Sequence, residues 1–271
     1  MSVLLQISDL HFGTEQTPVV EALVTLAHQQ RPELLVLSGD ITQRARVSQF
    51  QAARAFVDRL GAPRVLAIAG NHDIPLFHLG ERLLHPYARH RAAFGEDLEP
   101  LVSTPEWLVL CVNTTRWYRH KNGEVSAEQI ERVAQRLTSA QPAQLRVVVV
   151  HQPVAVPHAE DVHDRLRGHA GALQRWAAAG ADLVMGGHIH LPYVIALPGL
   201  ARPMWAVQAG TAVSSRVRDN IPNSVNLLRW GGTDAPAGCC LIERWDYSAS
   251  TRAFVRVIVT EVSPGHTSHA G

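Results

Sequence analysis

The sequence predicts an α/β fold in which two mixed β-sheets pack face to face with flanking helices outside them. Over the first two thirds of the chain, short apolar runs alternate with helix-like stretches, a pattern typical of parallel strands joined by helical crossovers. The last third contains strand-like runs joined by short links, which indicates antiparallel pairing. We expect these late strands to form a second sheet packed on the first.

The individual elements follow from composition and spacing. Six apolar runs rich in Val, Ile and Leu have the length of buried strands; they are residues 3–7, 34–38, 65–69, 108–112, 146–150 and 182–185. Four stretches carry apolar residues at helical spacing, namely 19–29, 49–60, 126–137 and 168–179. The third of these begins at Ser126, a favourable N-cap. The late strands are predicted at 193–197, 204–209, 224–230, 240–247 and 253–260.

We expect a single domain over residues 1–262 and a flexible C-terminal tail over residues 263–271, because the tail is rich in Ser, Gly and His. Residues 74–100 form a helical excursion that contains three prolines and directly follows a polar motif, so we expect it to lie over the mouth of a site. Its His and Arg side chains fit a solvated helical face, or a surface that contacts substrate or a second subunit. A lipid substrate would require an exposed apolar rim near residues 74–84.

Composition excludes several classes of protein. The chain has 271 residues, of which 46% are hydrophobic and 18% charged, and this composition excludes a disordered chain. Its formal net charge of +1 provides no overall positive electrostatic field that would attract nucleic acid. No apolar run approaches the ~18 residues of a membrane span, and the N-terminus reaches Asp9 without a basic residue, unlike a secretory signal. The three cysteines lack CxxC spacing, so we expect no disulfide framework, no thiolate zinc site and a cytoplasmic location.

Clusters of polar residues follow five of the predicted strands. They are Asp9-Leu10-His11, Gly39-Asp40, Gly70-Asn71-His72-Asp73, His151 and Gly187-His188-Ile189-His190. In open α/β sheets, ligands bind just outside the carboxyl ends of the strands. We therefore expect the five clusters to converge at one edge of the fold.

The residue types in these clusters indicate divalent metal ions. Asp and neutral His are N/O ligands. Asp9 and His11 are two residues apart, as are His188 and His190, so in an extended segment both side chains of each pair would face the same way. Four histidines, two carboxylates and an amide oxygen are too many for one tetrahedral ion. They suit two ions, ~3.5–4 Å apart, that share a bridging carboxylate.

These motifs, complete and in this order, resemble those of the calcineurin-like metallophosphoesterase superfamily over about residues 3–215. The resemblance implies the four-layer αββα fold of that superfamily. The metal ligands that it implies are Asp9, His11 and His190 for the first ion, Asn71, His151 and His188 for the second, and Asp40 as the bridge. His72 resembles the residue that hydrogen-bonds the scissile phosphate or protonates the leaving oxygen.

The strings at residues 7–13 and 70–73 resemble the class III, cyclic-nucleotide phosphodiesterase-like branch. The protein-phosphatase branch carries Gly-Asp-x-x-Asp-Arg-Gly at its second motif, where this chain has Gln43 and Ala45 in place of the second Asp and the final Gly. The resemblance therefore implies a phosphodiesterase that cleaves a small phosphodiester, such as a 3′,5′-cyclic nucleotide, by attack of a metal-bridging hydroxide.

Other readings stay open at this point. The same metal centre would serve a hydrolase of a glycerophosphodiester, a nucleotide-sugar lipid pyrophosphate or a phosphomonoester. The sequence has no basic stretch that would bind a nucleic acid polymer, and the intact set of predicted metal ligands disfavours a non-catalytic scaffold. Mn, Fe and Zn all accept this N/O set, and a homodimer is compatible with the sequence. Arg216 and Arg218 follow a late strand and are candidates for the opposite wall of the site.

Overall fold

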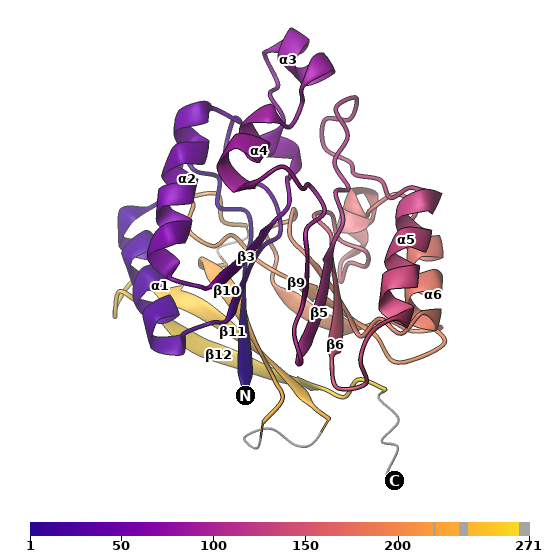
Figure 1. The fold of residues 1–271 in the computed structure, drawn as a ribbon. Helices are drawn as coiled ribbons and strands as arrows, with labels where there is room; N and C mark the ends of the chain where they lie inside the picture. The colour runs from indigo at the N-terminus through magenta and orange to yellow at the C-terminus, as the bar shows by residue number, and fades with distance from the viewer. Residues whose placement is uncertain (219–220, 233–237, 266–271) are drawn as a thin grey trace.

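The computed structural model describes residues 1–218, 221–232 and 238–265. Two six-stranded sheets pack face to face between two pairs of helices (Figure 1). Helices α1 (Thr17–Gln30) and α2 (Val47–Leu60) cover the outer face of one sheet, and α5 (Ala127–Thr138) and α6 (His169–Ala178) cover the other. This arrangement confirms the predicted fold of two mixed sheets with flanking helices.

The first sheet has the order β12-β11-β10-β1-β2-β3. Its strands are β1 (Ser2–Ile7), β2 (Leu34–Leu37), β3 (Arg64–Ala67), β10 (Ser224–Trp230), β11 (Cys240–Ser248) and β12 (Ala253–Val262). β1, β2 and β3 run parallel, whereas β10 joins the other side of β1 in the antiparallel sense.

The second sheet has the order β4-β5-β6-β7-β9-β8. Its strands are β4 (Leu101–Ser103), β5 (Trp107–Cys111), β6 (Leu145–Val149), β7 (Leu183–Gly186), β8 (Tyr193–Ala196) and β9 (Trp205–Gln208). The four central strands are parallel, and the short edge strands β4 and β8 are antiparallel to their neighbours.

The expectation that the late strands form a sheet of their own is wrong. β10, β11 and β12 extend the first sheet next to β1, while β8 and β9 extend the second sheet next to β7. The free side of β1 offers an unpaired row of backbone groups, which a late strand satisfies by pairing. The early strands are divided as well, because β5, β6 and β7 belong to the second sheet.

The strands of the sheet centres are apolar along their whole length because both faces are covered. Leu4 and Val36 of the first sheet lie in the core between the two sheets, together with Val147 of the second. Leu5 and Ile7 point the other way, into the core under α1 and α2. This continuous burial fixes the register of β1 and hence the position of the polar residues that follow it.

The excursion contains two short helices, α3 (Leu79–Leu84) and α4 (Ala88–Phe94), and α3 projects from the rest of the molecule (Figure 1). His90 does not belong to a solvated face, contrary to that interpretation of the excursion. Its side chain is buried, and its ring lies against the rings of Phe50 and Phe94. The excursion is thus anchored by α4 and exposed at α3.

Strand β12 ends at Val262, and residues 266–271 of the predicted tail lie outside the described residues. Two 3₁₀ helices, η1 (Asn71–Asp73) and η2 (Ala159–Asp164), lie beside the site described below. Within residues 1–218, 221–232 and 238–265, no helix is long and apolar enough to cross a membrane.

Candidate metal centre

The five polar clusters meet where the two sheets bring together the carboxyl ends of their strands. Side-chain ligand atoms form three groups whose members lie within 4.8 Å of one another: Asp9, His11 and His190; His11, Asp40 and His72; and Asp40, His151 and His188. Asn71 joins the third group, because its Oδ1 lies 3.3 Å from His151 Nε2. All seven predicted ligands and His72 therefore gather in one place, as the strand-end argument predicts.

The backbone at these residues is not extended, so the premise of the two-residue argument is wrong; Asp9 and His11 nevertheless reach the same ligand group, whereas His188 and His190 do not. Asp9 and His11 have φ of 52° and 43°, and His188 and His190 have φ of 78° and 59°. Asp40, with φ of 49°, is also left-handed. Non-glycine residues rarely adopt this region, and such strain clusters at functional sites. One consequence is that His188 and His190 reach different ligand groups.

Two glycines allow the clusters to approach one another closely. A Cβ atom at Gly70 would lie 2.1 Å from the backbone nitrogen of Asp40, and one at Gly187 would lie 1.9 Å from Ser8 Oγ. A side chain at Gly70 would push its loop away from the loop that carries Asp40, and a side chain at Gly187 would push its loop away from Ser8 and Asp9. These contacts explain why glycine precedes Asn71 and His188 in the sequence.

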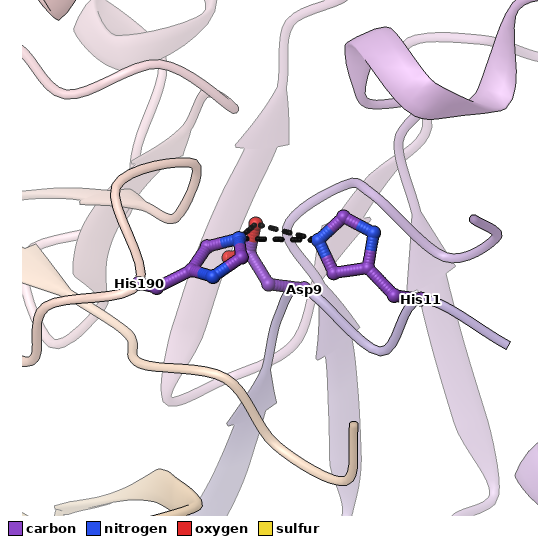
Figure 2. Close-up of side chains that lie close together, drawn as sticks. All are labelled: Asp9, His11 and His190. Carbon is purple, nitrogen blue, oxygen red and sulfur yellow. Dashed lines mark hydrogen bonds and ion pairs between the residues drawn. The ribbon is translucent and has the colours of Figure 1, made fainter. Parts of the chain in front are cut away.

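The first group joins one loop from each sheet (Figure 2). Asp9 and His11 come from the loop after β1, and His190 comes from the loop after β7. His190 Nε2 lies 3.4 Å from Asp9 Oδ1 and 3.1 Å from His11 Nε2. Three ligand atoms thus face a common point between the two sheets.

Asp40 belongs to both the second and the third of these groups. Asp40 Oδ1 lies 3.4 Å from His151 Nε2, and Asp40 Oδ2 lies 3.8 Å from His11 Nε2 of the first group. The two oxygens of one carboxylate therefore face two different groups of ligands. This position between the groups is the one that a bridging carboxylate requires.

Backbone carbonyls orient three of the imidazole rings. His151 Nδ1 lies 2.8 Å from the Ser38 carbonyl oxygen, and His190 Nδ1 lies 2.6 Å from that of Arg216. His72 Nδ1 lies 3.0 Å from the Gln43 carbonyl oxygen. Because a carbonyl only accepts, each of these Nδ1 atoms carries a proton, and each Nε2 faces the site, where the neutral ring would offer its lone pair to a metal ion.

Charge and burial favour ionised carboxylates at the centre. Burial alone would raise the pKa of Asp40, but His151, His72 and His11 hold that pKa well below its usual value. Burial lowers the pKa of His11 to about 3, and burial together with His151 lowers the pKa of His188 to about 3. Ionised carboxylates beside neutral imidazoles are the protonation states that metal ligation requires.

His151 differs, because the Asp40 and Asp9 carboxylates overcome the effect of its burial and raise its pKa to about 9. Its proton offsets the negative charge that Asp40 brings into a buried site. A bound cation would compete with that proton, since ligation requires the neutral ring.

The donor set fits divalent metal ions. Both ring nitrogens of His188 are buried without a hydrogen-bond partner in the described part of the chain, although such groups are costly to leave unsatisfied. Asp9, Asp40, His11 and His151 are fully buried or nearly so. Buried carboxylates and an orphaned imidazole facing a common point are what a metal site supplies, with nitrogen and oxygen atoms alone as donors.

Asp73, next to the predicted catalytic His72, has a structural role. Its carboxylate accepts hydrogen bonds from the backbone N–H groups of Gly70, Ile41 and Thr42, at 2.8 to 3.0 Å. Burial, with the nearby Asp40 charge, raises the pKa of Asp73 to about 6. The side chain thus ties the third motif to the second and belongs to none of the three ligand groups.

Sequence reasoning missed two features of the site. Asp164 Oδ1 lies 3.9 Å from His188 Nε2, and no motif or spacing marks Asp164 in the sequence. The carbonyl groups of Ser38, Gln43 and Arg216 that orient the rings are equally invisible there, because every residue has one. Arg216 carries a weak signal, as one of two arginines after a late strand, and its side chain reaches His72 and His11.

Comparison with known proteins identifies the class. Residues 2–192 match the family model described as calcineurin-like phosphoesterase. The match covers more than half of the chain, and the chain therefore belongs to the calcineurin-like phosphoesterase family, a class of phosphoric ester hydrolases.

Individual relatives agree with this class. A Synechococcus protein named as a probable cyclic nucleotide phosphodiesterase is 30% identical over 164 residues, which cover 56% of this chain and 59% of that protein. The chain thus matches less than two thirds of that relative's length.

Solved structures share the fold. A dimetal phosphatase from Danio rerio has a TM-score of 0.69 at 13% identity, covering 97% of this chain and 99% of that one. A purple acid phosphatase from yellow lupin has a TM-score of 0.71 at 12% identity, covering 97% of this chain and 53% of that one.

Proposed function

We propose that this protein is a phosphodiesterase that hydrolyses a small phosphodiester with two divalent metal ions, Mn, Fe or Zn, bound at the candidate centre. The observation that supports it most strongly is the position of Asp40 between two groups of buried ligands. Asp9, His11 and His190 would hold one ion, Asn71, His151 and His188 would hold the other, and Asp40 would bridge them.

The chain's own residues have distinct tasks in this proposal. Two bound divalent ions lower the pKa of a shared water and clamp an in-line displacement. Asn71 contributes a ligand without negative charge, which keeps the centre attractive to a phosphodiester anion. His72 donates its Nδ1–H to the Gln43 carbonyl, so Nε2 faces the site, and with a second proton on the ring Nε2–H would donate to the phosphate or protonate the leaving oxygen.

The lead substrate is a 3′,5′-cyclic nucleotide, and two observations support it. The curated relative is named for that activity, and the second motif lacks the acidic residue and the glycine of the protein-phosphatase pattern. We place the reaction in the cytoplasm, with no nucleic acid polymer as a partner.

The test compares hydrolysis of bis(p-nitrophenyl) phosphate and p-nitrophenyl phosphate by the Mn²⁺-loaded protein, with EDTA as the control. We expect a higher kcat/KM for the diester and loss of activity with the chelator. A panel of cyclic nucleotides follows. A consistent preference for the monoester would contradict the proposal and indicate a phosphatase.

An amphiphilic phosphodiester is a second candidate, because an apolar surface stands beside the site. Four side chains of the excursion are 56 to 77% exposed, and together they form the apolar crest: Phe77, Leu79, Leu83 and Leu84. Contiguous exposed apolar groups mark binding surfaces. Leu76 and Arg82 of the same segment line a cavity of about 40 Å³ together with His72 and Asn71, so the segment that carries the crest also reaches the site.

A pair of substrates with the same leaving group distinguishes the two candidates. The amphiphilic candidate predicts that the protein prefers hexadecyl p-nitrophenyl phosphate to methyl p-nitrophenyl phosphate. Replacing the four crest residues with serine would abolish this preference without changing the rate on the methyl ester. Equal rates on both esters in the wild-type protein would exclude this candidate and leave the small diester.

A further inference from the structure

Arg216 reaches into the candidate centre from the loop after β9. Its Nη1 lies 3.3 Å from His72 Nε2, 3.4 Å from His11 Nδ1 and 3.1 Å from Gln43 Oε1. These neighbours come from three of the loops that build the site. The guanidinium therefore lies beside both a predicted metal ligand and the predicted catalytic histidine.

The Arg216 side chain is half-buried, and no carboxylate of the described residues forms an ion pair with it. Within the described residues, the hydrogen bonds of the guanidinium all come from Nη1, which carries two of its five N–H groups, so the three on Nε and Nη2 can donate to another group. Arg218, two residues further along, contrasts with it, because its Nη1 pairs with Asp161 at 2.8 Å.

The loop does not need the Arg216 side chain for its own structure, because the backbone of this residue is held independently. Its carbonyl accepts hydrogen bonds from Thr211 Oγ1 at 2.9 Å and from His190 Nδ1 at 2.6 Å. Its backbone nitrogen lies 3.3 Å from Ser214 Oγ. The side chain is thus free to serve a ligand while the backbone orients His190.

Gln43 places Arg216 and His72 relative to each other. The Gln43 side chain accepts from Arg216, and the Gln43 carbonyl accepts from His72 Nδ1. The Arg216 guanidinium and the His72 imidazole are therefore held next to each other by one residue. A planar guanidinium is suited to this task, since its N–H groups match the oxygens of phosphate and form charge-assisted hydrogen bonds.

We propose that Arg216 is a substrate-binding residue whose guanidinium binds a non-bridging oxygen of the phosphate group that is cleaved. This inference rests on the proposed function for the identity of the ester, but the bound group itself is a phosphate oxygen. Arg216 adds positive charge next to the ions, so it contributes to binding of inorganic phosphate as well as of the ester.

The test measures binding of inorganic phosphate to the Mn²⁺-loaded protein by calorimetry, for the wild type, Arg216→Ala and Arg216→Lys. Loss of charge-assisted hydrogen bonds should weaken phosphate binding about 10- to 100-fold in R216A. R216K keeps the positive charge but lacks the planar set of N–H donors, so its affinity for phosphate should lie between those of R216A and the wild type. Arg175→Ala is the matched control, because Arg175 is a surface residue paired with Glu131, and should bind as the wild type does.

Metal content by mass spectrometry separates binding from structure, since R216A keeps the carbonyl that orients His190 and should keep its manganese. Added guanidinium ion should restore part of the lost phosphate binding in R216A and have no such effect on R175A. Wild-type affinity in R216A at equal metal content would overturn the proposal. A protein that binds phosphate through Arg216 but hydrolyses neither test ester would instead contradict the proposed function alone.

Discussion

Asp73 shows how a single side chain can hold a site in place without taking part in its chemistry. Its two carboxylate oxygens satisfy three backbone N–H groups and the Thr42 hydroxyl. These donors belong to the loops after β2 and β3, which carry Asp40 and Asn71. The distance between those two predicted ligands therefore depends on Asp73.

Replacing Asp73 with alanine should destabilise the protein by about 3 kcal/mol, because several buried donors lose their acceptor. Urea unfolding measures this difference in the free energy of unfolding. Asp58→Ala is the control, since Asp58 is exposed and pairs with Arg54 on the surface of α2. A D73A protein as stable as D58A would show that the donors find other partners.

His72 should be needed for turnover but not for metal binding. His72→Ala removes the Nε2 that faces the site and leaves all seven predicted ligands, so kcat/KM for a diester should fall about 10²- to 10⁴-fold. Mass spectrometry should find the same metal content as in the wild type. His28→Ala, on the surface of α1, serves as the control, and unchanged turnover in H72A would contradict the role.

At this scale, the sequence predicts the identity of the side chains better than the backbone that presents them. The chemistry of Asp, Asn and His indicates the predicted ligands directly. The left-handed backbone at Asp9, His11 and His188 cannot be located from these residue types alone, although Asp and His adopt that region more often than most residues. It arises from the packing of several loops against one another, which only the folded chain contains.

Among the elements, the sequence predicts the positions of the strands and helices well, but it does not predict which strands pair with each other. Periodicity reveals which segments are strands, and Ser126 caps α5 as predicted, since its Oγ accepts from the Gln129 N–H at 3.1 Å. Periodicity says nothing about which neighbour a strand chooses. The late strands are therefore divided between the two sheets, and β4, with three residues, is too short to give a pattern.

Strand β11 gives the first sheet a pH-dependent contribution to stability through Glu243. Burial alone would raise the pKa of Glu243, but hydrogen bonds from Arg229, Trp245 and Arg256 lower it below its usual value of 4.5. A lowered folded-state pKa means that the stabilisation is complete above the unfolded value and is lost as the pH falls through the folded value.

Glu243→Gln should therefore cost about 1–2 kcal/mol at neutral pH, where the wild-type carboxylate is ionised and hydrogen-bonded. The difference between wild type and E243Q in the free energy of unfolding should shrink as the pH falls below about 4.5. Urea unfolding at a series of pH values measures it. A difference that stays constant over this range would show that the charge of Glu243 does not contribute.

For the whole molecule, the order of the five motifs identifies the family because each motif follows a strand of a fixed topology. That order predicts the convergence of the clusters, and both the family and the fold are confirmed. The homodimer and the single-domain boundary at residue 262 stay predictions. Substrate identity depends on the walls of the site, such as Arg216 and the apolar crest, which no motif encodes.

The central claim is that two ions share Asp40. Anomalous diffraction from crystals soaked in Mn²⁺ tests it most directly. We expect two peaks about 3.5–4 Å apart, one beside Asp9, His11 and His190 and the other beside Asn71, His151 and His188, with Asp40 in contact with both. A single peak, or peaks away from Asp40, would contradict the dinuclear centre and the proposed chemistry that depends on it.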